Sequence, residues 1–183
     1  MAVIISLPDG STKEYPGAVS ALDIAKDISP RLADAALAAE INGKMVDISS
    51  IIDKDASVVI HTFKTEAGRQ LYWHSTAHLM AQAVKQLFPK VQVTIGPAID
   101  QGFYYDFDRD EPFTEEDLLN IEQRMKELIA NDLPYTRREL GKAEAIEAFR
   151  NMGENYKIEI LSEIPDGDVI STYTQGDFID LCR

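Results

Sequence analysis

Two of the three histidines of this chain, His74 and His78, lie four residues apart. On a helix this spacing puts both imidazoles on one face, with their Cβ atoms roughly 5–6 Å apart. Imidazole is the side chain whose ordinary pKa falls near neutral pH, so it serves for moving protons and for binding metals. Two of three histidines on one face therefore indicate a functional site rather than two unrelated core or surface residues.

A zinc site is one chemistry that these residues permit. A zinc protease is excluded, because its motif needs a glutamate directly after the first histidine, and that position is Ser75. His74, His78 and Cys182 are nevertheless three competent zinc ligands. A closed site would need a fourth ligand and an open site a water, and the sequence offers no local fourth ligand.

Lys157, Asp180 and Cys182 are the other candidates for chemistry. The apolar alternation around Lys157 predicts a strand over residues 156–161, with Lys157 and Glu159 on the same face. A second alternating run at 178–182 puts Asp180 and Cys182 on one face. Taken alone, the lysine fits a solvated residue and the cysteine a small buried apolar one.

Residues 1–62 are expected to form a small α+β domain. Strands are predicted at 3–7, 12–15, 35–41, 44–46 and 57–62, with Asn42 and Gly43 forming a hairpin turn. Ser20 is expected to begin a helix that Pro30 ends. This order favours a mixed sheet with one helix packed on it.

Residues 63–183 are expected to form a second α+β domain, with helices on one side of an antiparallel sheet. Helical spacing predicts a long helix at 65–87, a second one capped by Thr114 with an apolar stripe of Leu118, Ile121, Met125 and Leu128, and a third at 142–150. Strands are predicted at 91–95, 103–107, 156–161 and 178–182. These elements must bring together candidates that lie more than a hundred residues apart.

The composition excludes several classes of protein. Of 183 residues, 45% are hydrophobic and 27% charged, as in ordinary folded domains, and no run of about 18 apolar residues implies a membrane span. A secretory signal is not apparent, and one cysteine cannot form an internal disulfide, which favours the cytoplasm. A net charge of −13 argues against a general nucleic-acid binder.

Seven short motifs resemble domains of a known family. Two regions, together with the 20–28 helix between them, resemble the TGS domain, a ubiquitin-like β-grasp module of threonyl-tRNA synthetases, some GTPases and stringent-response enzymes. They are Leu7-Pro8-Asp9-Gly10 and Ile41-Asn42-Gly43 followed by Val46-Asp47. Five more resemble the editing domain of bacterial threonyl-tRNA synthetases: residues 74–78, Ile95-Gly96-Pro97, 102–106, 153–157 and 180–183. The resemblance implies a TGS domain at 1–62 and a tRNA editing domain at 63–183.

The resemblance also implies an activity. Editing domains of this family hydrolyse the ester of serine wrongly joined to threonine tRNA, tRNA(Thr). Serine and threonine differ by one methyl group, worth only about 1–3 kcal/mol in a pocket, so a synthetic site discriminates poorly and a second sieve is needed. The expected partner is the 3′ end of the tRNA, which needs few phosphate contacts and so tolerates an acidic protein.

Roles for single residues follow from the same resemblance. His74 and Lys157 would position and activate the attacking water, while His78, Asp180 and Cys182 would shape the pocket and hold the substrate. Tyr105 would contact the serine or the terminal adenosine, and Gly96 and Pro97 would line the substrate site. These editing domains work without metal, so none is expected here.

The chain departs from the family pattern in two respects. The family motif around Cys182 continues with Gly-Pro-His beyond Arg183, so a last pocket histidine is expected to be absent and activity reduced. Nothing resembles the aminoacylation core or the anticodon domain, so ATP, magnesium and zinc are expected only in a full-length enzyme, along with its homodimer contacts.

Two other functions stay open on the sequence. A non-catalytic module that binds tRNA or a nucleotide would bind without turnover. A zinc-dependent hydrolase would use His74, His78 and Cys182 as ligands.

Overall fold

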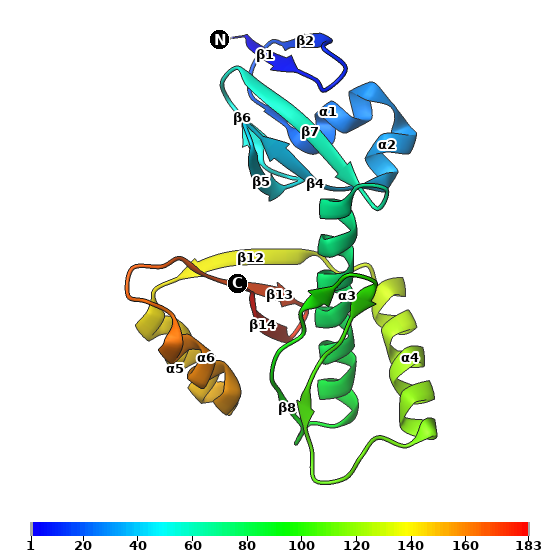
Figure 1. The fold of residues 1–183 in the computed structure, drawn as a ribbon, viewed down its shortest axis with the longest axis vertical. Coiled ribbons are helices and arrows are strands. Elements are labelled where there is room, and N and C mark those ends of the chain that lie inside the picture. Colours follow the sequence, from blue (N-terminus) through cyan, green and yellow to red (C-terminus); the bar gives the residue numbers. More distant parts are fainter. Residues whose placement is uncertain (1, 183) are drawn as a thin grey trace. The chain divides into compact units, whose positions relative to one another are not determined.

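The computed structural model describes residues 2–182 (Figure 1). The chain divides into two compact units, Met1–Trp73 and His74–Arg183, with the division inside helix α3 (Glu66–Leu87). Among the described residues, no helix combines the length and hydropathy needed to cross a membrane. Arg183, which the editing motif included, lies outside the described residues.

The first unit is a mixed five-stranded sheet with helix α1 packed on it (Figure 1). The strand order is β2-β1-β7-β4-β5, and only the pairing of β1 with β7 is parallel among the described strands. The core joins Ile24 of the helix to Val3, Ile5 and Val58 of the sheet, all at most 1% exposed. The expected mixed sheet with a packed helix is thus confirmed. The elements are β1 (Val3–Ser6), β2 (Thr12–Tyr15), β3 (Val19–Ser20), α1 (Ala21–Ile28), α2 (Pro30–Ala35), β4 (Ala36–Ile41), β5 (Lys44–Asp47), β6 (Ile51–Ile52) and β7 (Ala56–Thr62).

Local sequence signals account for the turns of this unit. Asn42 and Gly43 have φ angles of 51° and 82°, as a two-residue hairpin turn requires, and they join β4 to β5. The Ser20 side chain accepts the backbone N–H of Asp23 at 3.0 Å and caps α1. One expectation was incomplete: Pro30 does not only end the helix. It occupies the first turn of α2, where its missing N–H costs nothing, and Ser29 caps that helix.

The second unit begins with the C-terminal half of α3, beside which α4 (Glu115–Ala130) packs (Figure 1). Leu79 and Val84 of α3 meet Ile121 and Leu128 of α4 in one buried cluster. Thr114 and Asp117 form the capping box at the start of α4. Leu118, which the sequence placed on the buried stripe, is instead 57% exposed.

Four short strands lie between α3 and α4. They pair as β8 (Gln92–Val93) with β11 (Phe107–Asp108), and β9 (Ala98–Ile99) with β10 (Gly102–Phe103). The predicted strands at 91–95 and 103–107 are therefore too long. Residues 94–97 and 104–106 have irregular backbone, which leaves carbonyl groups such as that of Thr94 free to contact side chains.

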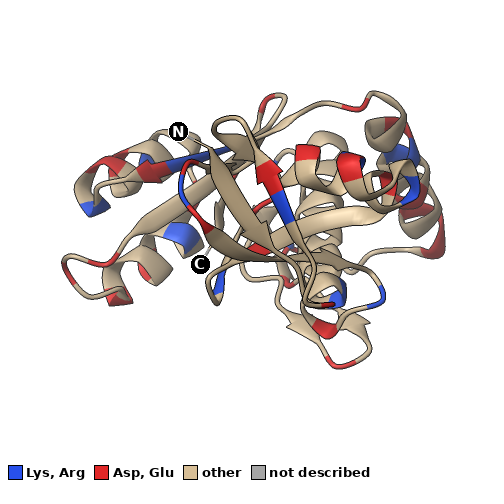
Figure 2. Cartoon of the chain, turned by 90° about the horizontal axis from the view of Figure 1, so that it is seen from above, with Lys and Arg blue, Asp and Glu red and all other residues tan. Residues whose placement is uncertain are grey.

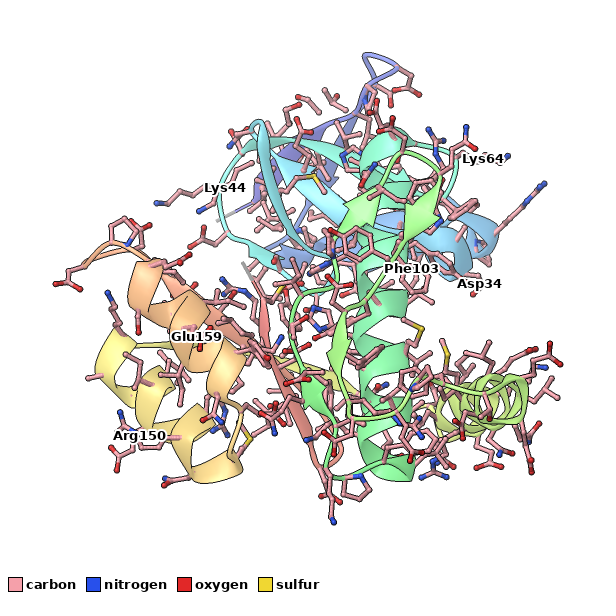
Figure 3. All side chains as sticks on the ribbon, turned by 60° about the horizontal axis from the view of Figure 1, so that its bottom comes forward. Asp34, Lys44, Lys64, Phe103, Arg150 and Glu159 are labelled. Atoms are coloured by element: carbon pink, nitrogen blue, oxygen red, sulfur yellow. The ribbon has the colours of Figure 1, made fainter. Side chains whose placement is uncertain are left out.

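A three-stranded antiparallel sheet completes the second unit, in the order β12-β13-β14. These strands are β12 (Tyr135–Leu140), β13 (Ile170–Gln175) and β14 (Phe178–Cys182), and only the last was predicted. Helices α5 (Lys142–Met152) and α6 (Asn155–Glu163) lie side by side in Figure 3, where Arg150 marks α5 and Glu159 marks α6. Phe149 and Leu161 from these helices pack with Ile170 and Leu181 of the sheet.

The predicted strand at 156–161 is wrong, because this segment is helix α6. Its buried positions are Glu154, Lys157, Leu161 and Ile164, a helical spacing. Two of these four residues are charged, so a search for apolar residues misses the helical period and finds only the alternation of Ile158 and Ile160. Lys157 and Glu159 consequently do not share a face: the lysine is 3% exposed and the glutamate is exposed.

Candidate active site

Four separate segments of the second unit bring the predicted residues together. Helix α3 carries His74 and His78 one turn apart, and strand β14 carries Asp180 and Cys182 two residues apart, hence on one face. Helix α6 supplies Lys157, and the loop between β10 and β11 supplies Tyr105. Sequence reasoning placed Lys157 on the wrong kind of element but in the correct cluster.

Asp180 is the centre of the cluster and is 1% exposed. Its Oδ2 accepts His78 Nδ1–H at 2.6 Å and the Tyr105 hydroxyl at 2.9 Å. Its Oδ1 accepts Lys157 Nζ at 2.7 Å and the backbone N–H of Leu181 at 2.8 Å. A carboxylate has about four acceptor sites, so Asp180 is fully used.

The Lys157 ammonium is equally occupied. Besides Asp180, it donates to the Thr94 carbonyl at 2.8 Å and to the Tyr105 hydroxyl at 3.0 Å. An ammonium has three N–H donors, so all three have partners. The Lys157 side chain, which is 3% exposed, is therefore held in one position.

His74, His78 and Cys182 form a chain of nitrogen and sulfur contacts. His78 Nε2 lies 3.1 Å from His74 Nε2, which lies 3.2 Å from Cys182 Sγ. Since Asp180 accepts from His78 Nδ1, that nitrogen carries a hydrogen. His74 Nε2 can hold only one hydrogen and has two neighbours that can give or receive it. The three groups therefore share a proton that can move among them.

The electrostatics of the cluster agree with this sharing. Burial lowers the pKa of His78, but the hydrogen bond to Asp180 and the neighbouring Cys182 outweigh it and raise that pKa to about 9. Burial raises the pKa of the Cys182 thiol, yet contacts with His74 and then His78 bring it down to about 6. Burial likewise raises the pKa of Asp180, and His78 and Lys157 bring it down to about 2. At neutral pH a cationic His78 thus lies between an anionic Asp180 and a Cys182 thiolate, and Lys157 forms an ion pair with Asp180.

A cavity of about 270 Å³ opens beside this cluster. His74, His78, Tyr105 and Lys157 contribute to its wall, as do Gly96 and Pro97. A side chain at position 96 would overlap the Tyr105 ring, so a glycine is needed for the backbone to lie against that ring. All eight residues that the sequence singled out therefore line this cavity or lie directly behind it.

The same three groups could hold a metal ion. The ligand atoms of His74, His78 and Cys182 lie within 4.8 Å of one another, and Asp180 orients His78 from behind, as carboxylates do for zinc-bound histidines. The part of the chain that the structure describes offers no fourth His, Cys, Asp or Glu in this group. These three groups also contact one another through His74 Nε2, at 3.1 Å to His78 Nε2 and 3.2 Å to Cys182 Sγ.

Sequence reasoning assigned no role to three further residues near the site, although Glu154 lies in the 153–157 motif. Thr94 acts through its backbone carbonyl, which no side-chain pattern reveals. Glu154 and Lys85 form a buried ion pair at 2.7 Å next to the start of α6. A signal for Lys85 existed, because residues 74, 78 and 85 share one stripe of α3 at helical spacing.

The chain holds 31 acidic and 18 basic residues, and Figure 2 shows both kinds distributed along the ribbon. Phosphate binding over a wide area is therefore disfavoured, and recognition would concentrate at the cavity.

Comparison with known proteins gives two kinds of match. Residues 3–62 match the model of the TGS domain. Threonine–tRNA ligases from Hahella chejuensis and Methylococcus capsulatus are 52% and 53% identical to this chain over 180 residues, which is 98% of this chain and 28% of each relative. The ligase of Burkholderia lata is 52% identical over 181 residues. The chain thus contains a TGS domain and corresponds in sequence, over nearly its whole length, to the N-terminal part of bacterial threonyl-tRNA synthetases, spanning about a quarter of the length of these relatives.

Proposed function

We propose that the second unit removes serine from mischarged seryl-tRNA(Thr) by hydrolysing its ester, as the editing step of a threonyl-tRNA synthetase in the cytoplasm. The observation that carries this proposal is the convergence of two imidazoles, a thiol, a buried lysine and a carboxylate on one cavity of about 270 Å³. Ester hydrolysis needs a base for water, and polar groups that hold the ester and stabilise developing negative charge.

His74 is the base in this proposal. It is half-buried, it lines the cavity, and its neighbours His78 and Cys182 can accept or return a proton. Water gives a proton to this trio as its oxygen bonds to the ester carbon. The bond to the ribose oxygen then breaks, and that oxygen takes the proton back, yielding serine and a tRNA with a free hydroxyl.

Lys157 and Tyr105 form the polar wall facing the substrate. Lys157 provides fixed positive charge at the cavity, and Tyr105 is held by Asp180 and Lys157, so its ring and hydroxyl have one orientation. A rigid wall can exclude a methyl group that a flexible one would admit. This rigidity supports selection of serine over threonine, with tRNA(Thr) as the partner.

The test is to offer the chain seryl- and threonyl-tRNA(Thr) and to measure loss of each ester. Serine loss is expected to be roughly tenfold or more faster, in line with one methyl group in a tight pocket. Equal rates would refute the sieve, and binding without turnover would favour a non-catalytic tRNA-binding module. His74→Ala and Lys157→Ala should each slow serine loss strongly, whereas Lys126→Ala, an exposed residue of α4, should not.

A zinc hydrolase is the second candidate, favoured by the three converging ligand atoms. Because this group offers only three ligands among the described residues, we favour the metal-free site. Metal analysis of the purified chain decides between the two: stoichiometric zinc, and loss of hydrolysis with a chelator, would establish the zinc enzyme instead.

A further inference from the structure

Glu154 and Lys85 form a buried ion pair that the proposed hydrolysis does not use. Their side chains are 7% and 20% exposed, and neither residue lines the cavity. Replacing such a pair by apolar residues is often neutral for stability, so stability alone is a weak reason for it. The pair must therefore be judged by what it holds in place.

The Glu154 carboxylate holds two segments that meet at Lys157. It stands directly before α6, three residues from the lysine, and its Oε2 accepts the backbone N–H of Val93 at 3.4 Å. The next residue after Val93 is Thr94, whose carbonyl accepts Lys157 Nζ at 2.8 Å. Glu154 thus fixes both the helix that carries the lysine and the strand end that supplies its acceptor.

Lys85 ties this arrangement to the histidine helix. It lies two turns beyond His78 on the same stripe of α3, and its Nζ also donates to the carbonyls of Pro89 and Val91 at 3.2 and 2.9 Å. The ion pair of Lys85 with Glu154 therefore fixes α3 against the start of α6. One turn along α6, Lys157 reaches Asp180, which binds His78.

We propose that the Lys85–Glu154 ion pair is a positioning pair for Lys157, setting the place of its ammonium relative to Asp180 and the cavity. This inference rests on the proposed ester hydrolysis for its kinetic consequences.

Glu154→Gln tests the pair, because it removes the charge and keeps the size of the side chain. The turnover rate for seryl-tRNA(Thr) is expected to fall roughly 10- to 100-fold, as for a displaced catalytic group, with KM changed less than about twofold. In a Lys157→Met background the same substitution should add almost nothing, because its effect passes through the lysine. Lys85→Arg should preserve most of the rate.

Two controls separate positioning from stability. Ile170→Val removes one buried methyl group from the α5–α6 core and should lower the melting temperature without changing turnover. The double variant Lys85→Met, Glu154→Met should stay folded, because a paired replacement leaves no charge unpaired, yet should lose turnover. Full turnover in that double variant would overturn the proposal, as would an effect of Glu154→Gln that persists undiminished in the Lys157→Met background.

An observable independent of activity keeps the inference separate from the proposed function. The hydrogen on His78 Nδ1 is donated to Asp180 Oδ2, and these two atoms are 2.6 Å apart. This proton should give a far-downfield NMR signal. Glu154→Gln should shift that signal by moving Lys157 on the other carboxylate oxygen, and Glu163→Gln, an exposed carboxylate on the same helix, should leave it unchanged. If the unmodified chain hydrolyses no ester, the editing proposal fails, and this signal alone decides: an unshifted proton overturns the positioning role.

Discussion

Asp180→Asn is the substitution with the largest expected effect on the second unit. The carboxylate receives four donors, from His78, Tyr105, Lys157 and the Leu181 backbone. An asparagine side chain offers one oxygen acceptor and turns the other group into a donor. Two of the four donors would then face an N–H group, and two buried cations would lose their counter-charge.

The magnitude can be bounded from two directions. The pKa of Asp180 is lowered from 3.8 to about 2. Since each pKa unit corresponds to about 1.4 kcal/mol, the folded state stabilises the ionised carboxylate by roughly 2–3 kcal/mol relative to the unfolded state. Removing one partner from a buried ion pair costs about 3–5 kcal/mol. We therefore expect the unfolding free energy of this unit to fall by roughly 3 kcal/mol.

Native-state hydrogen exchange at the buried α3 residues Ala77 and Ala81 measures this loss in the relevant unit. Asp177→Asn, an exposed carboxylate in the turn before β14, is the matched control and should change little. The pKa of His78 should also fall in the variant, because Asp180 raises it and burial opposes that effect. A loss below about 1 kcal/mol with an unchanged His78 titration would refute the charge balance deduced for the site.

Three further outcomes are expected. Gly96→Ala should displace the Tyr105 ring and reduce serine hydrolysis without unfolding the chain, as shown by kinetics and circular dichroism; an unchanged rate would contradict the close contact. Alkylation of Cys182 by iodoacetamide should show a thiolate midpoint near its pKa of about 6, and His74→Ala should move it upward; a midpoint near 9 in the unmodified chain would contradict the imidazole contact. Acid should weaken the second unit as pH falls from about 4 toward 2, because the lowered pKa of Asp180 makes its contribution present above the unfolded value and lost below the folded one; a pH-independent unfolding free energy in that range would contradict it.

Much of the first unit follows from its sequence because its signals are local. Asn42 and Gly43 can adopt the positive φ angles of a tight hairpin, and Ser20 can accept the free N–H at a helix start. The parallel pairing of β1 with β7 is different in kind. This pairing depends on how the chain crosses from one strand to the other. A pattern of apolar residues predicts that both strands exist but not that they pair.

The second unit was harder to predict because its buried faces contain polar residues. Helix α6 buries Glu154 and Lys157, and β13 buries Thr172 and Gln175. Strand β12 shows the opposite problem, since five of its six residues are exposed and leave no alternation to detect. Hydrophobic periodicity fails at α6 and β13 because their buried side chains serve hydrogen bonds or charge, and it fails at β12 because that strand buries almost nothing.

The site residues were nevertheless identifiable, and the reason lies in the scarcity of their chemistry. Two imidazoles one helical turn apart and a single thiol are easily recognised in a sequence. Which of these groups can accept a proton is decided by the hydrogen bonds in the structure. Lys157 cannot accept a proton from water while all three of its hydrogens are bonded to Asp180, Tyr105 and the Thr94 carbonyl. A base is then left only among His74, His78 and Cys182, and His78 is engaged by Asp180 at its other nitrogen. In the proposed hydrolysis the role of the lysine is consequently electrostatic, and the position of its ammonium is what the site must control.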